Sequence, residues 1–378
     1  MLRAINDARA VTPAGVIEGA TVVLEDGRIS GLSRRPESGP GTLDAAGRYL
    51  LPGLVDLHSD AIEKQLAPRP GVELPVELAF LEMDRYLATS GITTGFHALS
   101  LMSGSGRSLA LGRRLHDVVH ALRDGGLVRH ESHLRCELPE PESVAALEEI
   151  LNGGGSRLVS VMDHTPGQGQ FRDLEWFRRY WSEDRGMDEA RISAALERAG
   201  EGEAGFAAGQ LERVARAARS GGAVLASHDD DTPEKVELVA SNDARISEFV
   251  INESSARRAR ELGLYVSMGA PNVVRGRSSG GNLCATEAVR AGLVDTLCSD
   301  YHPPSLLQAA FKLAGDGLCS LSGAVALVTA GPAGALKLAD RGELREGATA
   351  DLVLVGGRFG LPTVTHTLLG GELVFTAG

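Results

Sequence analysis

The middle of the chain alternates eight times between a short apolar run and a longer helix-like stretch. The apolar runs are GLVDLHSD, GITTGFHALSL, ESHLRCEL, RLVSVMDHT, GAVLASHDD, RISEFVIN, LYVSMGAPNVV and VDTLCSD. Helices are expected near residues 75–90, 107–124 and 142–151 and over a long stretch near 173–220. Strands that alternate with helices form a parallel sheet, and eight such units close a (β/α)8 TIM-like barrel. An open doubly wound sheet is the alternative, but no GxGxxG follows the first strand and no GxxxxGK[ST] loop occurs.

Both ends of the chain have the pattern of β structure. Near the N-terminus, ATVVLEDGRISGLS places Asp-Gly between two apolar runs, which indicates a hairpin. Near the C-terminus, GATADLVLVGG and HTLLGGELVFTAG again combine apolar runs with glycine turns. We therefore predict an α/β protein in which residues 51–335 form the barrel, while residues 1–50 and 336–378 together form a small β-sandwich domain.

Composition and charge exclude several classes of protein. The net charge of -12 argues against a nucleic-acid-binding protein, and no apolar run reaches the 18 residues of a membrane-spanning helix. The N-terminal MLRAINDARAV lacks the apolar core of a signal peptide. The four cysteines are far apart without CxxC pairs, which is typical of reduced thiols in the cytosol. We expect a cytoplasmic protein with neither nucleic acid nor membrane as partner. Whether it forms a homo-oligomer stays open.

Five of the eight apolar runs end in His, Asp or Glu. The active site of a (β/α)8 barrel lies at the carboxyl ends of its strands, so these side chains are expected to converge. His58 and Asp60 end the first run and share one face, because residues i and i+2 of a strand point the same way. The other run ends contribute Glu137, His164, His228 and Asp300.

This set of imidazoles and carboxylates predicts a metal site. Both groups suit Zn²⁺, with Mn²⁺ or Fe²⁺ as alternatives. Six ligands exceed the needs of one tetrahedral zinc, so we expect two divalent ions bridged by a carboxylate. Glu137 is the expected bridge, because no lysine ends any of the runs. A single histidine at a strand end is more often structural than a ligand, and the prediction depends on the whole set.

The remaining histidines of the barrel region have structural interpretations. His130 and His133 lie within the third run and are expected to be structural or at the rim, and His97 is expected to be a packing residue. His116 and His120 are four residues apart on a predicted outer helix, but the glutamate of HExxH is missing. We expect that pair to lie on a solvated helix face.

Basic side chains near the strand ends favour an anionic substrate. Each one alone is more often a surface charge, and Arg135 could instead form an ion pair with Glu137. Arg275 and Arg277 lie in VVRGRSSGGN, a Gly/Ser loop whose backbone could bind an anion. His302 follows Asp300 and is either a substrate contact or a rim histidine. The candidate phosphate-binding residues are Lys64, Arg69, Arg135, Arg172, Arg275, Arg277 and His302.

The segment LPGLVDLHSD and the later SD of LCSD resemble motifs of the amidohydrolase superfamily. The usual His-x-His of the first strand is His-x-Asp here, with Asp60 in the second position. Longer phrases between residue 50 and about 315 resemble one subgroup, the diphosphatases of the carbon–phosphorus lyase pathway. These phrases are LHSDAIEKQLAPRPGV, HLRCELP, LVSVMDHTPGQGQF, VLASHDD, MGAPNVVRG and LCSDYHPPSLLQAAF.

The resemblance implies a metal-bearing barrel with a small β domain built from both termini. It implies hydrolysis of α-D-ribose 1-methylphosphonate 5-triphosphate to the 5-phosphate and pyrophosphate in phosphonate catabolism. It also implies that the six residues at the run ends bind the metals and that Asp300 accepts a proton from the attacking water. His164 departs from the usual pattern, because the superfamily places its later histidines on strands five and six.

The same ligand set could serve other chemistry. A metal-dependent deacylase or cyclic-amide hydrolase acting on a small anionic substrate is the alternative, because these ligands could equally activate attack on a carbonyl. A non-catalytic scaffold barrel is the third possibility, and an intact set of six candidate ligands argues against it.

Overall fold

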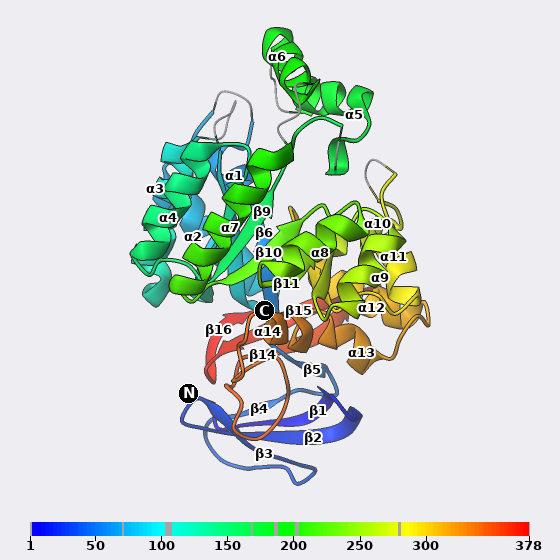
Figure 1. Cartoon of the computed structure of the whole chain (residues 1–378). Helices are drawn as coiled ribbons and strands as arrows, with labels where there is room; N and C mark the ends of the chain where they lie inside the picture. Colours follow the sequence, from blue (N-terminus) through cyan, green and yellow to red (C-terminus); the bar gives the residue numbers. More distant parts are fainter. Residues whose placement is uncertain are drawn as a thin grey trace.

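The computed structural model describes residues 2–69, 72–102, 108–167, 169–184, 188–200, 204–278 and 281–377. Eight parallel strands pair in the order of the sequence and form the central sheet (Figure 1). They are β6 (Leu54–Ser59), β7 (Ile92–Leu101), β8 (Arg129–Glu137), β9 (Leu158–Met162), β10 (Val224–His228), β11 (Ala244–Glu248), β12 (Tyr265–Gly269) and β13 (Thr296–Cys298). Each of the eight predicted apolar runs overlaps one of these strands, so the predicted barrel is confirmed.

The first and last strands of this sheet meet at a seam near their carboxyl ends. Ser59 and Asp300 form a parallel bridge, and the Asp300 amide donates to the His58 carbonyl at 2.9 Å. Beside the bridge, the Ser299 amide and hydroxyl donate to the buried Asp56 carboxylate at 2.9 and 2.5 Å. The seam therefore joins the two strand ends that carry predicted metal ligands.

Toward the amino ends of the strands, a short segment of chain fills the same seam. The Val55 amide donates to the Val328 carbonyl at 2.9 Å, and the Leu297 amide donates to the Leu327 carbonyl at 2.7 Å. Buried backbone groups need hydrogen-bond partners, and this segment supplies them where β6 and β13 diverge.

Helices surround the barrel (Figure 1). They are α1 (Ala61–Leu66), α2 (Val76–Thr89), α3 (Leu109–Leu122), α4 (Pro141–Asn152), α7 (Ala204–Ser220), α8 (Pro233–Ser241), α9 (Glu253–Glu261), α10 (Ala270–Arg275), α11 (Ala285–Arg290), α12 (Ser305–Gly315), α13 (Leu321–Ala326) and α14 (Ala330–Ala335). Their apolar faces and the outer faces of the strands share one large buried core. Burial of these amphipathic faces is what stabilises the barrel.

Side-chain caps start two helices shortly after the strands that they follow. The Thr232 hydroxyl accepts from the Lys235 amide at the start of α8, and Pro233 occupies the first turn. The Asn252 side chain accepts from the Ser255 amide at the start of α9. Such caps satisfy amide groups that the first helical turn leaves free. They keep the connections after β10 and β11 short, so the ends of these strands stay fixed at the barrel mouth.

An excursion after β9 projects away from the barrel. It contains α5 (Leu174–Arg179), a π-helical turn (Tyr180–Asp184) and α6 (Glu189–Gly200). Figure 1 shows α5 and α6 beyond the barrel, on the side opposite to the terminal sheet. Phe171, Phe177 and Ile192 form its small buried core, against which Trp176, Tyr180, Trp181 and Leu196 pack.

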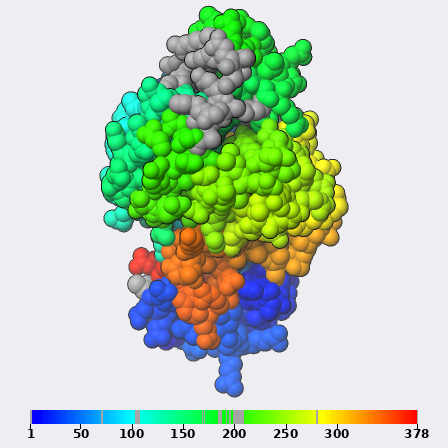
Figure 2. Space-filling view, viewed as in Figure 1, coloured from blue at the N-terminus to red at the C-terminus, as the bar shows by residue number. Residues whose placement is uncertain are grey.

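Strands from both chain ends form a second eight-stranded sheet, in the order β16-β15-β14-β5-β1-β2-β3 with β4 beside β1. They are β1 (Ala4–Thr12), β2 (Gly15–Glu25), β3 (Arg28–Ser33), β4 (Thr42–Asp44), β5 (Tyr49–Pro52), β14 (Leu352–Arg358), β15 (Leu361–Leu369) and β16 (Glu372–Thr376). Figure 2 shows these terminal segments gathered at one end of the molecule. The predicted β domain from both termini is confirmed, and its boundaries at residues 50 and 336 stay predictions.

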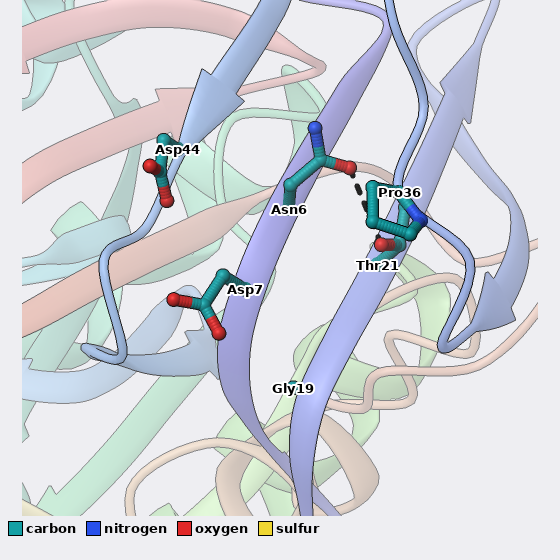
Figure 3. Close-up of a pocket in the computed structure, with 6 residues that line it drawn as sticks. All are labelled: Asn6, Asp7, Gly19, Thr21, Pro36 and Asp44. Atoms are coloured by element: carbon teal, nitrogen blue, oxygen red, sulfur yellow. Dashed lines mark hydrogen bonds between the residues drawn. The ribbon is translucent and has the colours of Figure 1, made fainter.

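The terminal sheet carries a pocket of its own (Figure 3). Its lining consists of Asn6, Asp7, Gly19, Thr21, Pro36 and Asp44. The Thr21 hydroxyl donates to the Asn6 side chain at 3.2 Å across one wall. None of these residues belongs to the predicted metal or phosphate site. No helix within the described ranges is long and apolar enough to cross a membrane.

Candidate active site

Alternate residues of β8 bring polar side chains to the interior of the barrel. His133, Arg135 and Glu137 share one face of this strand because side chains alternate. The His133 Nε2 atom lies 3.7 Å from a Glu248 carboxylate oxygen, and an Arg135 guanidinium nitrogen lies 3.5 Å from His228 Nε2. One strand thus contributes three polar groups to the site at successive depths.

His58, His228 and Glu248 form a compact cluster at the ends of β6, β10 and β11. One ligand atom from each lies within 4.8 Å of the other two, and all three residues are buried. The closest contact places His58 Nδ1 3.3 Å from Glu248 Oε2. The Phe249 ring covers both imidazoles, with ring centres 5.0 Å from His58 and 4.9 Å from His228. The His133 ring packs edge-on against His58 at 4.9 Å.

The donor atoms of this cluster fit a bound cation. His133 Nε2 and Glu248 Oε1 are buried without a hydrogen-bond partner among the described residues. Burial lowers the pKa of His58 well below its usual value and that of His133 to about 3, so both imidazoles are neutral and keep a lone pair. Burial also raises the pKa of Glu248. A divalent ion would use the orphaned lone pairs and balance the buried carboxylate.

Glu137 and His164 are joined to each other by hydrogen bonds. The Glu137 carboxylate accepts from the His164 amide at 2.7 Å and from its ring Nδ1 at 2.6 Å. Burial alone would raise the pKa of Glu137, but the interactions with His164 outweigh burial and lower it. The Phe171 ring packs 5.6 Å from the His164 ring and connects this pair to the α5–α6 excursion. The bridging role predicted for Glu137 stays a prediction.

Asp60 and Asp300 lie on opposite sides of the seam. The Asp60 amide donates to the Asp300 carbonyl at 2.8 Å. Burial raises the pKa of Asp300 well above its usual value, and the nearby Asp60 carboxylate raises it further. The positive charges of Arg135 and Lys64 act in the opposite direction. Two neighbouring carboxylates that are both half-buried favour either a retained proton or a cation between them.

Three residues at strand ends have left-handed backbone conformations. The φ angles of Asp229, Phe249 and Asp300 are 56°, 53° and 55°. This conformation costs a residue with a side chain about 1–2 kcal/mol, so the surrounding packing must enforce it. Asp229 follows His228 directly and places its carboxylate 2.8 Å from His228 Nδ1. The sharp turns direct the chain out of the barrel immediately after the clustered residues.

Lys235 supports the turn after β10 from the first turn of α8. Its ammonium donates to the carbonyls of His228 and Asp229 at 3.0 and 3.1 Å. The same ammonium lies 3.7 Å from the buried Asp230 carboxylate, which also accepts from the Ser247 hydroxyl. These bonds hold His228 in place from behind, as partners of metal ligands commonly do.

The structure brings some of the predicted phosphate-binding residues together. Arg135 is only 6% exposed and lies beside His228. The Lys64 ammonium lies 4.5 Å from the centre of the Tyr301 ring, and Arg275 donates to the Tyr301 hydroxyl at 3.4 Å. Arg69, Arg172, Arg277 and His302 are exposed, and their contact with phosphate stays a prediction.

Two residues of the site were not predicted: Glu248, a member of the buried cluster, and His133, which lies beside it. Glu248 ends β11, but the sixth apolar run continues through Phe249 and hides the strand end. His133 was expected to be structural or at the rim, yet its ring contacts the clustered residues. The signal for His133 was its place two and four residues before Arg135 and Glu137 on one strand face.

Two predictions about the outer histidines had different outcomes. His97 and His130 pack between the barrel and α2, where His130 bonds both His97 at 2.8 Å and Asp84 at 2.9 Å, as expected of structural residues. The solvated face predicted for His116 is wrong. Its ring is buried and bonds the Ser132 hydroxyl of β8 at 3.0 Å, because this side of α3 faces the sheet.

Comparisons with known proteins agree with this architecture. A family model described as "Amidohydrolase family" matches residues 85–375. The chain is 36% identical over 377 residues to the α-D-ribose 1-methylphosphonate 5-triphosphate diphosphatase of Escherichia coli (strain K12), covering 98% of this chain and 100% of that protein. It is 24% identical over 360 residues to an L-hydantoinase of Paenarthrobacter aurescens, covering 84% of this chain and 73% of the relative. The dihydropyrimidinase structure from Brevibacillus agri NCHU1002 superposes with a TM-score of 0.66 at 15% identity, covering 99% of this chain and 95% of that one.

Proposed function

The chain belongs to the amidohydrolase family, and from this premise we propose that it is a metal-dependent diphosphatase of phosphonate catabolism. Its substrate is α-D-ribose 1-methylphosphonate 5-triphosphate, which it hydrolyses to the 5-phosphate and pyrophosphate. The observation that carries this proposal is the 36% identity to the E. coli diphosphatase, which extends over 98% of this chain and 100% of the relative.

Members of this family typically use metal ions, and the buried cluster is a candidate site for one. The proposal includes two divalent ions, with Zn²⁺ favoured by the imidazole ligands and Mn²⁺ or Fe²⁺ as alternatives. Bound divalent ions would supply Lewis acidity and lower the pKa of the attacking water. The residues proposed to hold them are His58, His228 and Glu248, with His133 adjacent, and Asp60, Glu137, His164 and Asp300 from the predicted set.

Asp300 is proposed to accept the proton of the attacking water. Burial and the neighbouring Asp60 charge raise its pKa, whereas the charges of Arg135 and Lys64 favour the deprotonated form that a base requires. In the hydrolysis, the water oxygen bonds to phosphorus, the phosphorus–oxygen bond to the leaving group breaks, and pyrophosphate departs. The left-handed backbone at Asp300 and the seam bridge to Ser59 fix the carboxylate during this transfer.

Arg135 is proposed to bind a phosphate oxygen of the substrate. Its Nε atom is buried and lacks a hydrogen-bond partner among the described residues. The Arg135 charge already acts on the carboxylates of Glu248 and Asp300, and this Nε–H is a donor left over for a further anion. Arginine forms paired hydrogen bonds with phosphate, which would use this donor.

The test is to offer the triphosphate to metal-loaded enzyme and to measure pyrophosphate release. We expect release by the wild type and its loss in Asp300→Asn. Asp243→Asn is the matched control, because Asp243 is exposed and pairs with Arg219 away from the site.

Cyclic amides and N-acyl amino acids, offered in parallel, test the alternative that the 24% identity to an L-hydantoinase favours. Amide cleavage without pyrophosphate release would overturn the diphosphatase proposal. Pyrophosphate release that persists in Asp300→Asn would overturn the role of Asp300 alone.

A further inference from the structure

We propose that Tyr301 is a positioning residue, which holds Lys64 and Arg275 as a clamp for the terminal diphosphate of a polyphosphate ester. Lys64, Arg275 and Tyr301 together form this diphosphate clamp. The identity of the ester rests on the proposed function, whereas the binding of a diphosphate group can be measured without it.

The clamp draws on three separate connections at the carboxyl ends of the strands. Lys64 lies in α1 directly after β6, and Arg275 is the last residue of α10, which follows β12. Tyr301 comes immediately after Asp300, beyond β13. β12 and β13 are neighbours, and β6 joins β13 across the seam. The clamp therefore lies across the seam at the mouth of the barrel.

A single phenol contacts two cations in two different ways. The Lys64 ammonium lies over the face of the Tyr301 ring, 4.5 Å from its centre, in a cation–π contact. Arg275 donates a hydrogen bond from its guanidinium to the hydroxyl of the same ring at 3.4 Å. Two cations that converge on one side chain can both contact a diphosphate, because each of its phosphoryl groups carries negative charge.

The clamp lies beside the proposed proton acceptor. Tyr301 is bonded to Asp300 in the chain, and the Lys64 ammonium lies over the Tyr301 ring. Arg135 lies inside the barrel on β8, 3.5 Å from His228. Positive charge therefore flanks Asp300 from the interior and from the rim. A phosphate chain that spans both places would bring a phosphorus next to Asp300 and direct its leaving end toward the clamp.

Tyr301 matters because Lys64 and Arg275 are exposed and have long side chains. Flexible cations lose side-chain entropy when they bind an anion, and a preformed contact reduces that loss. The half-buried ring provides such contacts for both cations at once. Tyr301→Phe keeps the ring face for Lys64 and removes the acceptor for Arg275. Tyr301→Leu removes both contacts.

The first test is steady-state kinetics of the metal-loaded full chain with the triphosphate substrate. We expect KM to rise about 3–10-fold in Tyr301→Phe and about 10–100-fold in Tyr301→Leu, with kcat changed less than about 3-fold, because uniform binding is lost. Combining Tyr301→Phe with Arg275→Met should add little to Arg275→Met alone. Arg257→Met is the matched control, because Arg257 is exposed on α9 and pairs with Glu253.

The second test is calorimetric titration of the metal-loaded protein with inorganic pyrophosphate. We expect both Tyr301 variants to bind pyrophosphate more weakly than the wild type and Arg257→Met to bind it equally well. This measurement does not depend on turnover. If the leucine variant fails to fold, pyrophosphate binding by Tyr301→Phe alone tests the clamp.

The outcomes separate the clamp from the proposed function. If the wild type hydrolyses no triphosphate but its binding of pyrophosphate depends on Tyr301, the proposed function fails and the clamp stands. If hydrolysis is intact while KM and pyrophosphate binding are unchanged in both variants, the clamp is refuted. A fall in kcat alone would also refute it, because Tyr301 would then act on Asp300 instead of on the diphosphate. Absence of pyrophosphate binding by the wild type refutes it as well.

Discussion

Replacing Glu248 by glutamine should weaken metal binding while leaving the fold intact. The Glu248 side chain is fully buried, and its Oε2 atom lies 3.3 Å from His58 Nδ1 within the three-residue cluster. Glutamine has nearly the same shape, so packing is kept. What it removes is the negative charge that a cation would need among neutral imidazoles.

The size of the effect follows from linkage between binding and folding. A metal that binds only the folded state at 100 times its Kd stabilises that state by about 2.7 kcal/mol. Loss of one of three clustered ligands should weaken binding by about 100-fold, the upper end seen for groups that support metal sites. The same metal concentration then equals the Kd of the variant, and the stabilisation falls to about 0.4 kcal/mol. We therefore expect a loss of about 2.3 kcal/mol of metal-dependent stabilisation.

In the metal-free protein, the buried negative charge of Glu248 destabilises the folded state. Burial raises the pKa of Glu248, so the folded state retains a proton that the unfolded chain releases. The metal-free protein should therefore lose stability as pH rises above the usual range of a glutamate. Glutamine does not titrate. The free energy of unfolding of metal-free Glu248→Gln should therefore fall less than that of the wild type as pH rises.

The assay is urea unfolding of chelator-treated protein, with and without added Zn²⁺ or Mn²⁺ and at several pH values. Glu253→Gln is the control, because Glu253 is exposed on the neighbouring helix α9. The reasoning would be refuted if Glu248→Gln kept the full metal-dependent shift of the unfolding midpoint.

Three further predictions concern stability and the shape of the site. Asp351→Asn removes the ion pair between the buried Asp351 and the one-third exposed Arg129, so the free energy of unfolding should fall by about 2 kcal/mol. An unchanged urea midpoint would contradict this prediction. The Arg341 hydrogen bond lowers the pKa of Asp340 to about 2, so its stabilisation is complete above the usual value of 3.8 and is lost as pH falls through about 2. Asp340→Asn should lower the free energy of unfolding above pH 3.8 by less than about 1 kcal/mol, because the pair is partly exposed. Below about pH 2 the variant and the wild type should be equally stable, as urea unfolding at several pH values would show. Phe249→Asn should tolerate the left-handed backbone but loosen the covered imidazoles and raise the metal Kd about 10-fold; equal Kd values in metal titrations would disprove this.

The barrel could be predicted because its pattern repeats locally. Each strand is a short apolar run bounded by helix-like sequence, and neighbouring strands pair in sequence order. The residues at strand ends were predicted where a run stopped at a polar residue, as at His58 and His228. These features depend on a few neighbouring residues and so are visible in one sequence.

The rest of the site depends on contacts between distant residues. Glu248 was missed because Phe249 and the two residues after it are apolar, and the strand ends there through a left-handed backbone without glycine. His133 was missed because β8 continues for four residues beyond it, and only the last polar residue was counted. The burial of His116 depends on Ser132, which lies 16 positions away on β8. Contacts between residues so far apart in the chain leave no local sequence pattern.

The seam also determines the order in which the molecule can be completed on the ribosome. Asp56 and Ser299, which bond across it, are 243 positions apart in the chain. β6 is synthesised early and keeps one edge unpaired until β13 and the segment that fills the seam have emerged. Unpaired strand edges attract other chains, and long-range pairing is slow to form. A nascent chain therefore has to protect that edge through most of its synthesis, and its candidate active site comes together only in the closing step.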